Sequence, residues 1–112
     1  MRSVSTHILD TTFGKPAAGV PVSLEKKSEG AWEKAGGGMT DQDGRIRDLV
    51  PEGKLEAAIY RITFDTTAYY NLQAMECFYP EVSVVFQIRD IESHYHVPLL
   101  VSPYGYSTYR GS

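Results

Sequence analysis

The stretch HYHVPLLVSPYGYSTYRGS, residues 94–112, decides the fold predicted for this chain. Residues 94–101 alternate with a period of two, which is typical of a β-strand with one buried face. The apolar row of this strand consists of Tyr95, Val97, Leu99 and Val101, and the opposite row of His94, His96 and Pro98. Because proline has no backbone N–H, Pro98 is expected at a bulge or an unpaired position. Residues 104–110 predict the last strand.

The segments before this stretch carry the same strand pattern. Residues 3–10 alternate, with Val4, Thr6 and Ile8 on the more apolar face and His7 on the other. Further strands are predicted over 19–27, 31–35, 55–64 and 80–90, and the three glycines at 36–38 predict a mobile loop. Seven or eight short strands with frequent turns predict an all-β sandwich. The length of the chain predicts one domain over residues 1–112.

One short helix is expected within this series of strands. Asp65 or Thr66 is a suitable N-cap residue, and the helix is expected to end near Glu76. Three residues recur at helical spacing and are therefore expected to pack into the core: Tyr69, Leu72 and Met75.

Composition and charge exclude several classes of protein. The net charge is −3 and no basic block is present, which argues against a nucleic-acid-binding role. No apolar run reaches the roughly 20 residues that a membrane helix needs. Cys77 is the single cysteine, so an intrachain disulfide is impossible. No signal peptide is recognisable, which predicts a cytoplasmic location, or a periplasmic or peroxisomal one if a targeting segment has been removed.

The DQDG run at residues 41–44 has the wrong spacing for a calcium loop, because no further acidic ligands follow at the required positions. Asp-Gly instead predicts a tight turn that leads into a strand carrying Arg45 and Arg47.

Four motifs together resemble one known family. They are STHILD at 5–10, TDQDGR at 40–45, HVPLLVSP at 96–103 and YRGS at 109–112. With these motifs the chain resembles the 5-hydroxyisourate hydrolases, the transthyretin-like enzymes of purine catabolism and urate degradation. The YRGS tetrapeptide distinguishes these hydrolases from transthyretin, the hormone carrier with the same fold. The similarity spans nearly the whole sequence.

The resemblance implies a transthyretin-like sandwich of two four-stranded sheets with one short α-helix. It also implies a homotetramer, built as a dimer of dimers, with the active site in a groove where the dimers meet. The implied reaction is the hydrolysis of the cyclic amide of 5-hydroxyisourate at its N1–C6 bond. The product is 2-oxo-4-hydroxy-4-carboxy-5-ureidoimidazoline. No cofactor and no metal are implied.

The resemblance also assigns residues to this chemistry. The catalytic residues are expected to be His7, Arg45, His96 and Ser112, and the substrate-binding residues His7, Arg45, Tyr109 and Arg110. Histidine suits proton transfer because its ordinary pKa of roughly 6.5 lies near working pH. The His7 and His96 pair is therefore expected to activate water, with the choice between them open. An arginine has a planar, always cationic donor fork that suits an oxyanion or a urate-like ring.

Three other interpretations are compatible with parts of the sequence. A transthyretin-like carrier would bind a hydrophobic aromatic ligand in the same channel, although apolar or neutral residues would serve such a channel better. A metal site is a second alternative, because His94 and His96 share one strand face and His7 offers a third imidazole. A sandwich module for adhesion or scaffolding is the third and remotest alternative.

Overall fold

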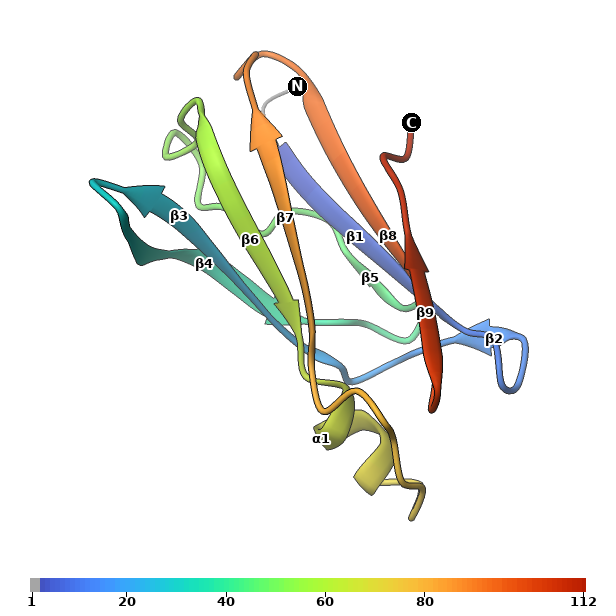
Figure 1. Ribbon diagram of the computed structural model, residues 1–112. Coiled ribbons are helices and arrows are strands. Elements are labelled where there is room, and N and C mark those ends of the chain that lie inside the picture. The colour runs from blue at the N-terminus through green and yellow to red at the C-terminus, as the bar shows by residue number, and fades with distance from the viewer. Residues whose placement is uncertain (1–2) are drawn as a thin grey trace.

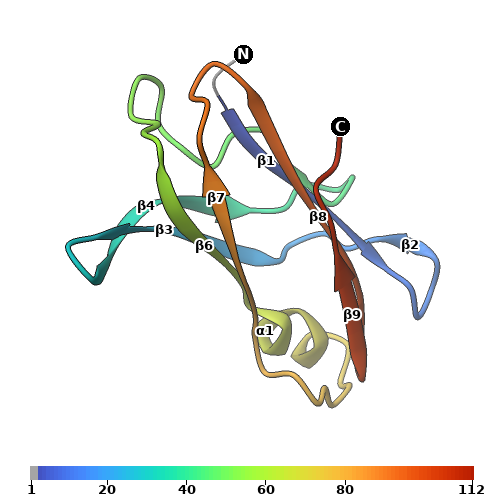
Figure 2. The same ribbon diagram turned by 45° about the horizontal axis from the view of Figure 1, so that its top comes forward.

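The computed structural model describes residues 3–112, which form two packed β-sheets with one helix at one end of the sandwich (Figures 1 and 2). The first sheet contains β1 (Ser3–Asp10), β2 (Lys15–Pro16), β5 (Arg45–Ile46), β8 (His94–Ser102) and β9 (Gly105–Thr108). The second sheet contains β3 (Pro21–Ser28), β4 (Ala31–Met39), β6 (Ala58–Phe64) and β7 (Val82–Ile88). The helix is α1 (Thr66–Asn71). Within residues 3–112, no helix is long and hydrophobic enough to cross a bilayer.

The first sheet is built around a parallel pair made from the two ends of the chain. Strand β1 pairs with β8 over its full length, from Ser3 opposite His94 to Asp10 opposite Val101. Strand β9 continues the sheet beyond β8, and β2 and β5 pair with β1. The predicted architecture is confirmed, with one difference: the two-residue strand β5 makes this sheet five-stranded instead of four-stranded.

The core lies between the sheets and is formed by the apolar rows predicted from alternation. The inward residues of β1 and β8 are buried: Val4, Thr6 and Ile8 in β1, and Tyr95, Val97, Leu99 and Val101 in β8. All of them except Thr6 pack in the same hydrophobic cluster as the inward residues of β3 and β6. Because alternate residues of a strand point to opposite faces, the polar rows of β1 and β8 must lie together on the outer face of the first sheet.

The helix is shorter than predicted, and one of its assigned core residues is wrong. Asp65 caps it, since its carboxylate accepts a hydrogen bond of 3.0 Å from the backbone N–H of Ala68. The helix then ends at Asn71 instead of near Glu76. Leu72 forms the C-cap and is 83% exposed, because the chain leaves the helix before that side chain can face the core.

The glycines at 36–38 lie inside β4 and do not form the predicted loop. Glycine is required there because β4 passes very close to a neighbouring segment. A Cβ atom on Gly36 would overlap the carbonyl oxygen of Leu49, and the backbone N–H of Gly37 donates to that same oxygen at 3.0 Å. A cluster of glycines therefore indicates close packing here, and not mobility.

Candidate active site

Strand register brings three of the predicted site residues to the outer face of the first sheet. Ser5 lies opposite His96 in the β1–β8 pair, and His7 lies opposite Arg45 in the β1–β5 pair. Residues directly opposite one another share a face, and so do residues two apart on one strand. His7, Arg45 and His96 therefore belong to one polar surface, although the sequence places them in three separate strands.

The tight turn before β5 fixes the position of Arg45. The Asp41 carboxylate accepts hydrogen bonds of 2.9 Å from the backbone N–H groups of Asp43 and Arg45. These bonds lower the pKa of Asp41, and the bond from Arg45 is the largest cause. Gly44 has a φ of 74°, and a Cβ atom there would lie 2.5 Å from the Ile8 carbonyl oxygen. The turn predicted from Asp-Gly is confirmed, and it holds the start of β5 against β1.

Two serines hold two histidines in a hydrogen-bonded row. Ser3 Oγ lies 2.5 Å from Nδ1 of His94, and Ser5 Oγ lies 3.0 Å from Nε2 of the same ring. Ser5 Oγ also lies 2.7 Å from Nδ1 of His96. The two imidazole rings are stacked, with centroids 6.2 Å apart and planes inclined by 17°. Both nitrogens of His94 are therefore engaged, whereas Nε2 of His96 has no hydrogen-bond partner within residues 3–112.

The C-terminal segment runs beside β8 and reaches the same face (Figure 2). Strand β9 ends at Thr108, which pairs with Leu99 of β8. The next residue of β8 towards its start is Pro98, which has no backbone N–H to donate to the C-terminal segment. The unpaired position predicted for Pro98 is confirmed on this side of the strand. Pairing then resumes at His96, whose carbonyl oxygen accepts a hydrogen bond of 2.8 Å from the backbone N–H of Gly111.

These contacts form a pocket of about 500 Å³ on the outer face of the first sheet. Its lining includes the polar residues Ser5, Arg45, Arg47, His94, His96 and Ser112. His7 lies beside this pocket, opposite Arg45. The sequence predicts no catalytic or substrate-binding role for Ser3, Ser5 or His94, although Ser5 lies in the STHILD motif and His94 in a His-x-His spacing that also suits a metal.

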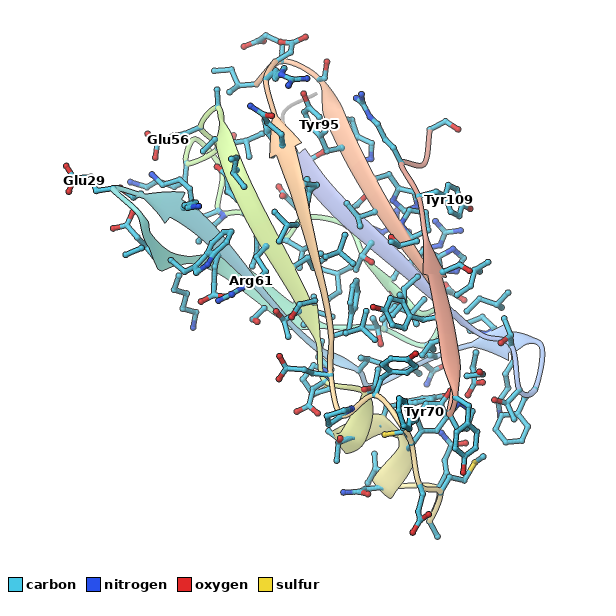
Figure 3. The ribbon with its side chains drawn as sticks, viewed as in Figure 1. Glu29, Glu56, Arg61, Tyr70, Tyr95 and Tyr109 are labelled. Carbon is cyan, nitrogen blue, oxygen red and sulfur yellow. The ribbon has the colours of Figure 1, made fainter. Side chains whose placement is uncertain are left out.

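The two other predicted substrate-binding residues border a second cavity. This cavity, of about 200 Å³, lies between β7 and the β8–β9 pair and is lined in part by His96, Tyr109 and Arg110. The Arg110 guanidinium lies over the Tyr95 ring at 4.6 Å from its centroid. Tyr109 is 58% exposed and points away from the sandwich beside the C-terminal segment (Figure 3). His96 is the predicted residue that both cavities share.

The surroundings of His96 lower its pKa below the ordinary histidine value. Burial is the main cause, and the charges that His94, His7 and Arg45 carry when protonated add to it, while a hydrogen bond with the Ser5 backbone opposes the shift. The imidazole is therefore neutral at neutral pH, and one of its nitrogens is an acceptor. A neutral imidazole beside a permanently charged guanidinium can take a proton from water while the guanidinium holds a developing negative charge.

The alternative of a three-histidine metal site finds no support in the described structure. No group of three or more His, Cys, Asp and Glu side chains within residues 3–112 is placed to hold a metal ion. Hydrogen bonds to serines occupy both nitrogens of His94, and one of the two nitrogens of His96.

Within residues 3–112, two sheets with a single helix, and an imidazole–guanidinium pocket on the outer face of one sheet, define a transthyretin-like protein that carries groups suited to hydrolysis. The family model described as HIUase/Transthyretin family matches residues 4–111. The chain belongs to this family.

Known relatives of the chain include both 5-hydroxyisourate hydrolases and transthyretin. It is 50% identical to a 5-hydroxyisourate hydrolase of Salmonella typhimurium over 109 residues, which cover 97% of this chain and 80% of that protein. It is 39% identical to the mouse 5-hydroxyisourate hydrolase, with 97% and 94% coverage. The solved Klebsiella pneumoniae 5-hydroxyisourate hydrolase superposes with a TM-score of 0.86 at 36% identity, covering 98% and 99% of the two chains. Transthyretin from Sparus aurata superposes with a TM-score of 0.93 at 34% identity, covering 99% and 97%.

Proposed function

We infer that this chain is an enzyme that hydrolyses 5-hydroxyisourate in urate degradation, opening its ring amide to give 2-oxo-4-hydroxy-4-carboxy-5-ureidoimidazoline. The fold is shared with transthyretin and does not distinguish the enzyme from the carrier. Half of the aligned residues are identical to those of a curated hydrolase. The observation that carries the function is the pocket, which brings the neutral His96 and the cationic Arg45 together where a carrier would need an apolar lining.

We assign the proton transfers to His96. Its Nε2 atom takes a proton from water as the water oxygen attacks the ring carbonyl. The Arg45 guanidinium donates hydrogen bonds to the carbonyl oxygen, which becomes negative. The protonated imidazole then gives its proton to the leaving ring nitrogen as the carbon–nitrogen bond breaks. The enzyme returns to its starting state, with one water consumed.

We assign the neighbouring residues to substrate binding. His7 lies opposite Arg45 across β1 and β5, so the two side chains can contact adjacent parts of one flat ring. Ser112 lines the same pocket and offers its hydroxyl to the substrate or to the attacking water. Tyr109 and Arg110 would contact the substrate from the neighbouring cavity that His96 also borders.

We also propose that the enzyme is a homotetramer, a dimer of dimers, in which a second protomer closes the pocket. In a single chain the pocket lies open on the outer face of the first sheet, whereas hydrolysis benefits from a site shielded from bulk water. Sedimentation velocity would show one species with four times the mass of the chain. A monomer that retained full activity would contradict this assembly.

The function is tested by following 5-hydroxyisourate directly. Urate oxidase generates the compound from urate in the cuvette, and its ultraviolet absorbance then decays spontaneously. Catalytic amounts of the protein are expected to accelerate this decay. Tight binding of a hydrophobic aromatic ligand, with no effect on the decay, would instead favour the carrier function.

Metal removal is expected to leave the activity unchanged. The proposed steps use an imidazole, a guanidinium and water, and His94 is engaged by two serines. The rate of 5-hydroxyisourate decay is measured after exhaustive dialysis against a chelator and compared with an untreated sample. A loss of activity that a divalent metal restored would contradict the proposed mechanism.

The acid limb of the pH profile is expected below pH 6.5. His96 must be neutral to accept a proton, and burial together with nearby positive charge holds its pKa under the ordinary value. As the pH falls, kcat/KM therefore stays high through the ordinary histidine pKa of about 6.5 and declines only at lower pH. The profile is measured with the spontaneous decay subtracted at each pH. An acid limb above the ordinary histidine pKa would contradict this assignment.

Residues appended after Ser112 are expected to reduce turnover more than they reduce stability. Ser112 lines the pocket, and Gly111 anchors the segment to the backbone of His96. An extension would begin at the lining of the pocket and would compete with the substrate for that space. Activity and thermal melting are compared for the chain with a short tag at either end. Equal activity of the two tagged forms would show that the segment does not work in catalysis.

A further inference from the structure

The row of hydrogen bonds through Ser3, His94, Ser5 and His96 can run in two directions, because the distances do not show which partner donates in each bond. Each neutral imidazole has one N–H donor and one acceptor nitrogen, and each serine hydroxyl has one donor hydrogen. Ser5 touches both rings, so its hydrogen can point to Nε2 of His94 or to Nδ1 of His96, but not to both. The choice made by Ser5 therefore decides which nitrogen of His96 carries the proton.

In one direction the row prepares His96 to act as a base. His96 donates its Nδ1–H to Ser5 Oγ, Ser5 donates its hydroxyl hydrogen to Nε2 of His94, and His94 donates its Nδ1–H to Ser3 Oγ. The Nε2 atom of His96 then carries a lone pair and has no protein partner within residues 3–112. In the opposite direction Ser5 donates to Nδ1 of His96, whose Nε2 then carries a hydrogen and cannot accept a proton from water.

We propose that His94 is a positioning residue, which accepts the hydroxyl hydrogen of Ser5 and so holds His96 in the tautomer whose Nε2 is free to act as a base. This inference rests on the proposed function, in which His96 activates water. His94 itself does not contact the reacting atoms, because serines engage both of its nitrogens.

The position of His94 on the strand supports this role over simple packing. The in-register parallel pairing sets Ser3 opposite His94 and Ser5 opposite His96, so the two serines and two histidines lie in two facing rows. Both serines are buried, which makes an unpaired hydroxyl costly and favours a fully bonded row. Both Nδ1 and Nε2 of His94 are hydrogen-bonded, as expected for a ring held in one tautomer.

Three substitutions test the role through kinetics. His94→Leu removes the acceptor for Ser5, whose hydroxyl can then donate to His96 instead. We expect kcat to fall by about tenfold or more, with KM little changed. The upper limit is the ~10⁴-fold loss that a wrong histidine tautomer causes in serine proteases. His94→Gln places an amide oxygen near the former Nε2 and is expected to retain most of kcat. Ser5→Ala is expected to lose as much as His94→Leu, and the double variant no more than Ser5→Ala alone.

Ser83→Ala serves as the matched control. This variant also removes a hydroxyl from a serine–hydroxyl pair, with Thr63 on the second sheet, and is expected to leave kcat unchanged. Full kcat in His94→Leu, or losses in Ser5→Ala and His94→Leu that simply add, would overturn the proposal.

A spectroscopic measurement separates this inference from the proposed function. The ¹⁵N chemical shifts of the His96 ring distinguish the two neutral tautomers at a pH above the histidine pKa. We expect the Nδ1–H form in the unchanged protein and in His94→Gln, and a shift toward the Nε2–H form in His94→Leu. An Nε2–H form in the unchanged protein would overturn the positioning role. If the unchanged protein failed to accelerate 5-hydroxyisourate decay, the proposed function would fail whatever the tautomer.

Discussion

The substitution His96→Asn is expected to lower kcat by roughly 10²- to 10⁴-fold, the usual size of lost general acid–base catalysis. In the unchanged protein, Ser5 Oγ lies 2.7 Å from Nδ1 of His96. Asparagine places its amide near the position of that nitrogen and so keeps a partner for Ser5. Nothing replaces Nε2, the atom assigned to proton transfer. The loss should therefore appear in kcat while the fold is retained. Steady-state kinetics and thermal melting of the purified variant measure the two effects separately.

The variant His96→Gln is a matched comparison, because glutamine keeps a polar group at the position of Nε2 and loses the one at Nδ1, whereas asparagine does the opposite. Glutamine reaches toward the former Nε2 position but gives up the contact with Ser5, and its amide cannot take a proton at neutral pH. It should be as inactive as His96→Asn. His7→Asn removes a residue assigned to substrate binding and is expected to raise KM more than it lowers kcat. A His96→Asn enzyme with undiminished kcat would remove His96 from the mechanism.

The substitution Gly111→Ala is expected to lower kcat by about 100-fold, the cost of misplacing a catalytic group by roughly 1 Å. A Cβ atom on Gly111 would sit 2.4 Å from Cδ2 of His96 and 3.1 Å from Cγ of Pro98. Either the imidazole rotates away from Ser5, or the C-terminal segment moves and loses its hydrogen bond to the His96 carbonyl. Both movements disturb the pocket.

The matched control for this variant is Gly105→Ala, which adds the same methyl group nearby in the same part of the chain. A Cβ atom on Gly105 would lie 3.9 Å from Ser102 Oγ, an ordinary contact. Its activity and melting temperature should match those of the unchanged protein. Equal activity of the two variants would mean that the close approach of Gly111 to His96 has no role in catalysis.

The strands were predictable because their inward and outward residues alternate. The rows through Val4 and Ile8 in β1 and through Val97 and Leu99 in β8 are buried as expected. The errors fall where local pattern and tertiary packing disagree. Leu72 has helical spacing, but the helix ends one residue earlier. The glycines of β4 have the composition of a loop, but their lack of side chains is what allows β4 to pass close to Leu49.

The sequence motifs single out three residues that the structure brings to one face, but they do not reveal the hydrogen bonds around them. His7, Arg45 and His96 came from motifs, and their common face follows from a register that no local pattern specifies. The role of Ser5 depends on parallel pairing of the first and penultimate strands, which alternation alone does not reveal. The His-x-His spacing was a usable signal for His94, but spacing does not distinguish a metal ligand from an imidazole held between serines.

The parallel pair of β1 and β8 has a consequence for how the protein is made. Ser3 and His94 are 91 residues apart, so β1 has no partner on that side of its sheet until β8 has been synthesised. Contacts of such long separation slow folding. Until then β1 presents an unpaired backbone edge, which is prone to aggregation. The candidate pocket is assembled only when this late pairing occurs, so a nascent or truncated chain that lacks β8 should be both inactive and poorly soluble.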